Sequence, residues 1–262
     1  MTLLFKAVLL GVVEGLTEFL PISSTGHLIV AGKMIGFDDA SFEIFIQLGA
    51  ILAVVVVCWR DLGQRLRGMW HVGNDQRVVV RVLTAFAPAV IVGLALHHTI
   101  KQYLFNPLSV SLAMIVGGVA IIWIERRAAT PTTHTLDTVR TRQALGIGGA
   151  QLLAMWPGFS RAGASILGGM LAGLDRTTAT LFSFYLAIPT MFGATTLDLW
   201  KSRHDLHTDQ FSAYAVGFLT SFLVAWFVIR WLLHYIAHHS FTVFGVYRVV
   251  VGTAILLMQI AK

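Results

Sequence analysis

Charged residues and cysteine are both scarce in this sequence. Only 12% of its 262 residues are charged, whereas 56% are hydrophobic, and the mean hydropathy is +0.75. This composition excludes an ordinary soluble domain and indicates an integral protein that crosses a membrane several times. The single cysteine, Cys58, excludes both a disulfide framework and a cysteine-based metal site. The net charge of +6 does not indicate nucleic-acid binding, because the basic residues concentrate in two loops between apolar segments.

Eight apolar segments follow one another along the chain. Most are near the roughly 20 residues that a membrane-spanning helix needs. Arginines cluster in the loops 60–81 and 125–142, which predicts that both loops are cytoplasmic. The loop 201–209 carries balanced charge and is expected on the exterior. The apolar segments are 3–20, 42–59, 78–98, 108–124, 144–171, 178–199, 211–233 and 241–260.

The number of crossings requires that two of these segments enter and leave the membrane on the same side. The loops 125–142 and 201–209 are expected on opposite sides of the membrane, so an odd number of crossings must join them. Two apolar segments lie between these loops, so one of the two cannot cross. The segment 144–171 is the re-entrant candidate because Pro157-Gly158 interrupts it. The same reasoning makes 3–36, broken at Pro21 to Gly26, a hairpin that enters from the exterior. We therefore predict an all-α polytopic membrane protein with six spanning helices, two re-entrant helix hairpins and both termini on the exterior.

The two hairpins resemble each other in sequence. Pro21-Ile22-Ser23-Ser24 matches Pro157-Gly158-Phe159-Ser160 as P-x-x-S, and the two hairpins enter from opposite faces. This predicts an inverted-topology repeat within a single membrane domain, 1–262, with half-repeats of approximately 1–124 and 143–262. Repeats of this kind commonly place their site near the middle of the membrane, where the broken helices meet.

The first hairpin carries acidic and hydroxyl side chains in the stretch E-G-L-T-E-F-L-P-I-S-S-T-G-H. Glu14 and Glu18 share a helix face, where two carboxylates without a cation would repel each other. We therefore predict that they bind a divalent cation, Mg²⁺ or Ca²⁺, as a cofactor. Ser24 is the candidate nucleophile, with Glu18 or His27 as its base, and direct attack by water is the open alternative. The donor-rich turn of Ser23, Thr25 and Gly26 is predicted to bind phosphate.

The second hairpin adds a cation. Arg161 offers a planar set of donors suited to phosphate oxygens, and the helix that follows points its positive end at the break. Gly158, Ser160 and Ser165 are predicted to bind phosphate beside it, and Gln47 and Gln151 to support the site. Structural roles are the alternatives: an ion pair between Arg161 and the glutamates, helix capping by the hydroxyls, and interhelical hydrogen bonds from the glutamines.

Together the two hairpins provide what hydrolysis of a phosphoanhydride requires. The reaction needs positive charge on the phosphoryl oxygens, a positioned nucleophile and proton transfer. The competing interpretation is a transporter or flippase of a phosphorylated lipid or small anion, because inverted repeats with broken helices are also a transporter architecture.

Two long motifs in this chain resemble the bacterial undecaprenyl-diphosphate phosphatase family, also called bacitracin-resistance proteins. They are G-V-V-E-G-L-T-E-F-L-P-I-S-S-T-G-H at 11–27 and P-G-F-S-R-A-G-A-S at 157–165. Shorter matches at 42–54, 105–107 and 193–198 extend the resemblance to nearly the whole chain. The family motif usually reads P-G-x-S-R-S-G-x-T, so Ala162 lacks the usual hydroxyl, whereas Ser165 keeps one in place of threonine. This departure argues against an essential hydrogen bond from position 162.

The resemblance implies both a substrate and a location. It implies removal of the terminal phosphate from the C55 isoprenyl diphosphate carrier, which recycles the carrier for cell-wall synthesis and lowers bacitracin sensitivity. It places the protein in the bacterial inner membrane, with a site that opens to the exterior. It assigns acidic roles to Glu14 and Glu18, nucleophile or acid–base roles to Ser24 and His27, and the phosphate clamp to Arg161. The expected partners are a polyprenyl diphosphate lipid and the bilayer, and a homodimer is left open.

Overall fold

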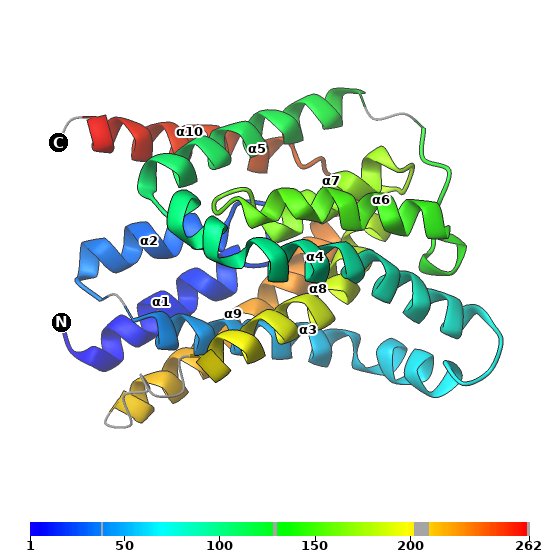
Figure 1. The fold of residues 1–262 in the computed structure, drawn as a ribbon, viewed down its shortest axis with the longest axis horizontal. Coiled ribbons are helices and arrows are strands. Elements are labelled where there is room, and N and C mark those ends of the chain that lie inside the picture. The colour runs from blue at the N-terminus through cyan, green and yellow to red at the C-terminus, as the bar shows by residue number, and fades with distance from the viewer. Residues whose placement is uncertain (38, 128–129, 202–209, 261–262) are drawn as a thin grey trace.

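The computed structural model describes residues 1–37, 39–127, 130–201 and 210–260 (Figure 1). Nearly all of the predicted exterior loop 201–209 lies outside these ranges. Within them the protein is helical, apart from connections and one isolated β-bridge between Thr133 and Leu174. The helices are α1 (Leu3–Thr17), α2 (Ser24–Ile35), α3 (Ala40–Gly68), α4 (Asn74–Leu104), α5 (Pro107–Arg127), the 3-10 helix η1 (Leu136–Thr138), α6 (Thr141–Gln151), the 3-10 helix η2 (Leu152–Met155), α7 (Arg161–Leu171), α8 (Arg176–Lys201), α9 (Phe211–Ile236) and α10 (Thr242–Ile260).

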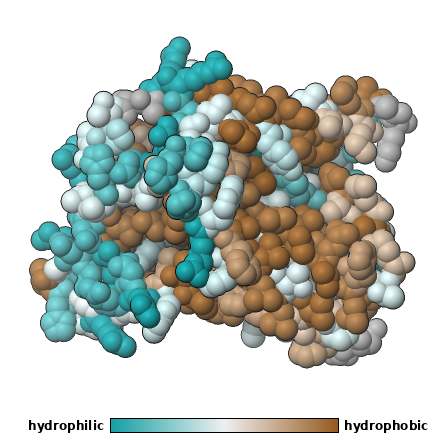
Figure 2. Space-filling model, turned by 180° about the vertical axis from the view of Figure 1, so that it is seen from behind, coloured by the Kyte–Doolittle hydropathy of each residue, from teal (hydrophilic) through white to brown (hydrophobic). Residues whose placement is uncertain are grey.

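Six helices in the described part of the chain are long and apolar enough to cross a membrane, which confirms the predicted all-α, multi-pass architecture. These spans are Ala40–Gly68, Asn74–Leu96, Pro107–Arg127, Arg176–Trp200, Phe211–Ile236 and Thr242–Ile260. Hydrophobic side chains cover much of the flank in Figure 2, whereas hydrophilic side chains gather at one end. The apolar part of α4 ends near Leu96, in agreement with the predicted segment 78–98, but the helix itself is longer. The helix continues to Leu104, because the break comes only where Asn106 and Pro107 start α5.

Both predicted hairpins are present as broken helix pairs. The first consists of α1 and α2 with a break at 18–23, and the second of α6, η2 and α7 with a break at 156–160. Figure 1 shows the open end of the first pair beside both chain termini, whereas the second pair opens at the opposite end of the molecule. Their tips meet near the centre, where Arg161 contacts Glu18. The re-entrant placement in a membrane, the inverted repeat and the half-repeats stay predictions.

Glycines allow α1 to lie directly on α9. A Cβ atom on Gly11 would be 2.7 Å from the carbonyl oxygen of Gly217, and one on Gly15 would be 2.7 Å from that of Ser221. Small residues four positions apart let helix backbones approach this closely. The close approach buries Glu14, which lies between the two glycines and is only 1% exposed.

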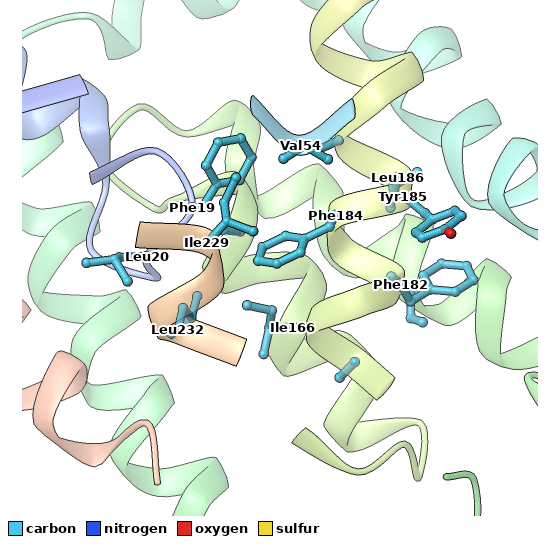
Figure 3. Close-up of a cluster of buried hydrophobic side chains, with 14 of the residues drawn as sticks. Phe19, Leu20, Val54, Ile166, Phe182, Phe184, Tyr185, Leu186, Ile229 and Leu232 are labelled. Carbon is cyan, nitrogen blue, oxygen red and sulfur yellow. The ribbon is translucent and has the colours of Figure 1, made fainter. Parts of the chain in front are cut away.

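A hydrophobic core lies beside the meeting point of the two hairpins (Figure 3). Phe19, the residue after Glu18, is fully buried and packs edge-on against Phe184 of α8, with ring centroids 5.6 Å apart. This packing fixes the first break against α8 and α9 and keeps its surroundings apolar. Other members of the core are Leu20, Val54, Ile166, Phe182, Tyr185, Leu186, Ile229 and Leu232.

Ion pairs join the helices at the end opposite the chain termini. Arg65 of α3 contacts Asp137 of η1 at 2.6 Å and Asp61 at 2.8 Å. Arg176 of α8 donates to both carboxylate oxygens of Glu125, which also accepts from the backbone N–H of Phe241. The first set of contacts ties α3 to η1, and the second ties α8 to α5 and to the residue before α10.

Candidate active site

Each helix break contains a serine in a strained backbone conformation. Ser23 has φ 74° and Ser160 has φ 76°, and they are the only non-glycine residues with positive φ in the described ranges. Each serine caps the helix that follows: Ser23 Oγ accepts from the N–H of Gly26 at 3.4 Å, and Ser160 Oγ from that of Gly163 at 3.0 Å. Strain of this kind concentrates at functional sites, which directs attention to the two breaks.

The shared geometry corrects the register in which the sequence aligned the hairpins. Matching the prolines as P-x-x-S pairs Ser24 with Ser160. The positive φ angles and the caps instead pair Ser23 with Ser160 as S-x-x-G. The proline match fails because Pro21 precedes its strained serine by two residues and Pro157 by three. In the corrected register, Ser24 and Arg161 occupy equivalent positions at the start of their helices.

Those two equivalent residues converge on one carboxylate. Ser24 Oγ donates to Glu18 Oε2 at 2.5 Å, and Arg161 Nη2 donates to Glu18 Oε1 at 3.2 Å. The side chains of Glu18 and Arg161 are 6% and 12% exposed, so this contact is shielded from water. The structure therefore brings the carboxylate and the hydroxyl of the first hairpin together with the cation of the second.

Arg161 is held in place while part of its donor capacity stays unused. Nη1 donates to the carbonyl oxygen of Ser183, Nη2 also contacts Met191 Sδ, and the guanidinium lies 5.6 Å from the ring centre of Phe19. Nε is buried without a hydrogen-bond partner. An unpaired buried donor is costly unless a ligand uses it, and phosphate oxygens are suitable acceptors.

Glu14 provides an unused acceptor beside this donor. It lies one helical turn before Glu18, and its buried Oε2 has no hydrogen-bond partner. The described residues contain no group of three or more histidine, cysteine or acidic side chains that could hold a metal ion by themselves. Mg²⁺ is commonly held by one or two carboxylates with substrate phosphates completing the shell. The two carboxylates therefore suit such a cation. Glu18 already binds Ser24 and Arg161, whereas Glu14 Oε2 has no hydrogen-bond partner.

His27 points to a different partner from the one that the sequence suggested. Its Nδ1 lies 2.7 Å from the carbonyl oxygen of Ser23 and its Nε2 lies 2.8 Å from the hydroxyl of Tyr247 on α10. Because a carbonyl can only accept, Nδ1 carries the proton and Nε2 accepts from Tyr247 in the neutral ring. Glu18, not His27, is thus the group in contact with Ser24 Oγ.

The other predicted residues divide into two groups. Gly158 and Ser160 lie in the second break, where Gly158 has φ 98° and Ser160 caps α7. Thr25 and Gly26 lie in the first turn of α2. Ser165 is fully buried, donates to the carbonyl oxygen of Arg161 at 2.9 Å and lies 2.7 Å from Ser183 Oγ. That arrangement orients α7 instead of presenting the hydroxyl to a ligand.

Gln151, Gln47 and Ala162 differ in how deeply they are buried. Gln151 is 2% exposed and contacts Thr190, whereas Gln47 is half-buried on α3. Ala162 is fully buried in the apolar core, so the residue that replaces the usual serine contributes packing and no side-chain hydrogen bond.

An apolar cavity of about 360 Å³ extends from Arg161 between α4, η2 and α8. Most of its lining is hydrocarbon, and Gln151, Thr190 and Asp198 supply polar atoms. The cavity connects the charged centre to a space suited to a hydrocarbon chain. Its apolar lining includes Phe86, Val90, Leu94, Met155 and Leu197.

Three residues that matter to this geometry were not predicted from the sequence. Arg248 is fully buried against both breaks, Tyr247 contacts His27, and Ser183 accepts from Arg161 through its carbonyl oxygen. Arg248 was detectable, because it is an ionisable residue inside the apolar segment 241–260, the same signal that singled out Glu14. Tyr247 and Ser183 carry no comparable signal, since tyrosine and serine are ordinary residues of membrane helices.

Comparison with known proteins identifies the family. The family model described as "Bacitracin resistance protein BacA" matches residues 7–254, which include both breaks and α10 up to residue 254. The chain belongs to the BacA family. Three relatives named undecaprenyl-diphosphatase are similar over nearly their full length. The protein from Verminephrobacter eiseniae is 49% identical over 97% of this chain and 94% of its own. The Deinococcus radiodurans protein is 51% identical over 95% and 92%, and the Nitrosomonas europaea protein is 48% identical over 97% and 94%.

Membership in the BacA family accounts for both long motifs of the chain. The match covers the acidic stretch at 11–27 and the arginine stretch at 157–165, which the fold brings into contact through Glu18 and Arg161. The expected resemblance is thereby confirmed, and the multi-pass membrane architecture agrees with it.

Proposed function

We propose that this protein is a membrane-embedded undecaprenyl-diphosphatase, which hydrolyses undecaprenyl diphosphate to undecaprenyl phosphate and inorganic phosphate. The reaction recycles the lipid carrier for cell-wall synthesis and lowers sensitivity to bacitracin. The similar proteins named undecaprenyl-diphosphatase support this assignment. The structural observation that carries it is the single buried carboxylate, Glu18, bonded to a hydroxyl from one hairpin and an arginine from the other.

In the first step Ser24 attacks the terminal phosphorus. Glu18 Oε2, at 2.5 Å from Ser24 Oγ, takes the hydroxyl proton as the new O–P bond forms. The bond from phosphorus to the bridging oxygen breaks, and undecaprenyl phosphate leaves with that oxygen. Arg161 donates to the phosphoryl oxygens through the Nε that has no protein partner, which stabilises the charge that these oxygens carry in the transition state.

In the second step a water molecule hydrolyses the phosphoserine. The water attacks phosphorus, its proton passes to a carboxylate of the site, and the Oγ–P bond breaks to return Ser24 with a proton from Glu18. Attack by water in a single step is the alternative that the sequence left open. Quenching a reaction with substrate labelled in the terminal phosphate distinguishes the two, because only the covalent route leaves label on Ser24.

Glu14 and Glu18 would hold a divalent cation, Mg²⁺ or Ca²⁺, together with phosphate oxygens of the substrate. Such a cation would supply positive charge that offsets the negative charge of the diphosphate. Glu14 is suited to this role because its buried Oε2 lacks a partner. Titration of metal-free protein with each cation should restore phosphate release in the wild type and fail to do so in Glu14→Gln.

The part of the substrate's hydrocarbon chain next to the diphosphate would lie in the apolar cavity that ends at Arg161. The end of the molecule that carries both chain termini would face the exterior of the inner membrane, because the arginine-rich loops lie at the opposite end. The diphosphate would then enter from the exterior leaflet. Blocking reagents applied to intact cells should reach a cysteine introduced at Met34, in α2, and spare one introduced at Trp70.

One assay separates the hydrolase from a carrier of phosphorylated lipid. The Ser24–Glu18 pair favours hydrolysis, because a carrier needs no activated hydroxyl. Detergent-purified protein should release inorganic phosphate from undecaprenyl diphosphate over many turnovers, and Arg161→Ala should abolish release. Stoichiometric binding of the lipid without phosphate release would contradict the proposed function.

A further inference from the structure

Arg248 is the largest fully buried side chain among the described residues, and it lies where the two hairpins meet. It belongs to α10, outside both site motifs, and its exposed fraction is 0%. The described residues show no carboxylate paired with it. A buried guanidinium is costly without compensation, so its position calls for a specific role.

The hydrogen bonds of Arg248 all go to backbone carbonyls of three segments, and its guanidinium also lies 5.7 Å from the ring centre of Phe159. Five hydrogen bonds connect the guanidinium to five different carbonyl oxygens. Two acceptors are in α5, one is in the first break and two are in the second. The bonds run from Nε to Met114 (3.2 Å), from Nη1 to Pro21 (3.1 Å) and Phe159 (2.7 Å), and from Nη2 to Ala113 (3.1 Å) and Gly158 (2.9 Å).

The acceptors in the two breaks are equivalent positions. Pro21 precedes Ser23 by two residues, and Gly158 precedes Ser160 by two residues. Arg248 therefore binds the same carbonyl in each strained turn and ties both to one rigid group. The fork of an arginine has the fixed geometry that such simultaneous contacts require, whereas a lysine ammonium has three donors and no planar fork.

The bond to Phe159 also orients a donor. In a trans peptide the C=O and the following N–H point in opposite directions. Holding the carbonyl of Phe159 on Arg248 turns the N–H of Ser160 away from Arg248. That N–H lies at the start of α7, where helix donors lack intrahelical partners and can bind an anion.

Space for the guanidinium depends on a glycine in α5. A Cβ atom on Gly117 would lie 2.6 Å from Arg248 Cζ, so even alanine must displace the guanidinium. Gly117 thus provides a way to move the group without removing its charge. Gly146 of α6 is the matched control, because a Cβ there meets nothing within 4 Å.

We propose that Arg248 is a positioning residue that holds the two breaks in register, so that Ser24 and Arg161 meet on Glu18. This inference rests on the proposed hydrolase function for its kinetic consequences. Displacement of catalytic groups by about 1 Å can cost on the order of 100-fold in rate. Loss of Arg248 should therefore lower kcat more than it changes KM.

The kinetic experiment uses purified full-length protein with Arg248→Lys, Arg248→Met and Gly117→Ala. We expect kcat for phosphate release per folded molecule to fall at least tenfold in Arg248→Met and Gly117→Ala, and less in Arg248→Lys. Gly146→Ala and Arg230→Met, which removes an exposed arginine of α9, should retain wild-type kcat. If total activity falls only as much as the folded fraction falls, kcat per folded molecule is unchanged, and the proposal is overturned. Should Arg248→Met fail to fold, Gly117→Ala decides the question alone.

A second readout needs no activity. Spin labels at Met34 of α2 and Leu171 of α7, both exposed, report the distance between the hairpins in a Cys58→Ser background. A narrow distance distribution in the unsubstituted protein should broaden or shift in Gly117→Ala and stay narrow in Gly146→Ala. An unchanged distribution in Gly117→Ala would overturn the proposal. An inactive wild type with the expected distances would instead refute the hydrolase function and leave the positioning role standing.

Discussion

Replacement of Glu18 by glutamine tests the chemistry of the site with the smallest change in shape. Glutamine keeps an oxygen that can accept from Ser24 or Arg161, and it removes the negative charge and the ability to take a proton. Because Glu18 Oε2 contacts the attacking hydroxyl at 2.5 Å, we expect the loss to appear in kcat. KM should change little or fall, since Arg161 no longer pairs with a carboxylate.

The expected magnitude follows from two effects. Removing a general base typically costs about 10²- to 10⁴-fold in rate, or about 3 to 5 kcal/mol of barrier. Breaking a buried ion pair destabilises a protein by up to about 5 kcal/mol. The second effect should be smaller here, because Arg161 keeps Ser183 and Met191 as partners and glutamine retains a carbonyl. Glu18→Gln should thus fold and bind substrate while being nearly inactive.

The assay is steady-state phosphate release from undecaprenyl diphosphate in detergent, with the folded fraction measured by thermal unfolding. Asp137→Asn is the matched control, because it makes the same carboxylate-to-amide change in the 2.6 Å pair with Arg65, which lies away from the site at the end opposite the chain termini. That variant should lose stability and keep its kcat. A Glu18→Gln protein with kcat within threefold of wild type would refute the assignment of Glu18 as the base.

Three further predictions address other parts of the site. Arg161→Lys should raise KM and lower kcat, by about 10- to 100-fold in kcat/KM, because lysine cannot reproduce the planar fork; unchanged kinetics would contradict the clamp. Tyr247→Phe removes the hydroxyl that donates to His27 Nε2. We expect the pH profile of kcat to change, with less than a tenfold loss of kcat at the optimum pH. An unaltered profile would show that the contact has no role in the reaction. Gly15→Leu should destabilise the fold by about 1 to 3 kcal/mol or more, because its side chain meets the backbone of α9, and thermal unfolding measures this loss.

Much of the architecture could be predicted because a bilayer constrains the sequence strongly. Apolar length identified the spans, and the breaks at Pro21 and Pro157 located the interrupted helices. The buried carboxylates and Arg161 were detectable for the same reason, since ionisable side chains are rare in such segments. The meeting of the two hairpins followed from the expectation that broken helices meet near the middle of the membrane, whereas the convergence of Ser24 and Arg161 on Glu18 was seen only in the structure.

The details of the site depended on geometry that residue spacing does not encode. The equivalence of Ser23 and Ser160 is set by their positive φ angles, and the prolines gave a register one residue out. The contact of His27 Nε2 with Tyr247 joins residues 220 positions apart in the chain, so spacing could not predict it. Arg248 carried the same signal as Glu14, but its binding to carbonyls of both breaks could not be deduced without the fold.

A double-mutant cycle on phosphate release tests most directly whether the two hairpins form a single catalytic centre. It compares kcat/KM of wild type, Glu18→Gln, Arg161→Met and the double variant. Residues that act as one unit give losses that do not add. If the two hairpins form one catalytic centre, kcat/KM of the double variant should lie within about tenfold of that of the worse single variant. A double variant whose loss equals the product of the two single losses would contradict it.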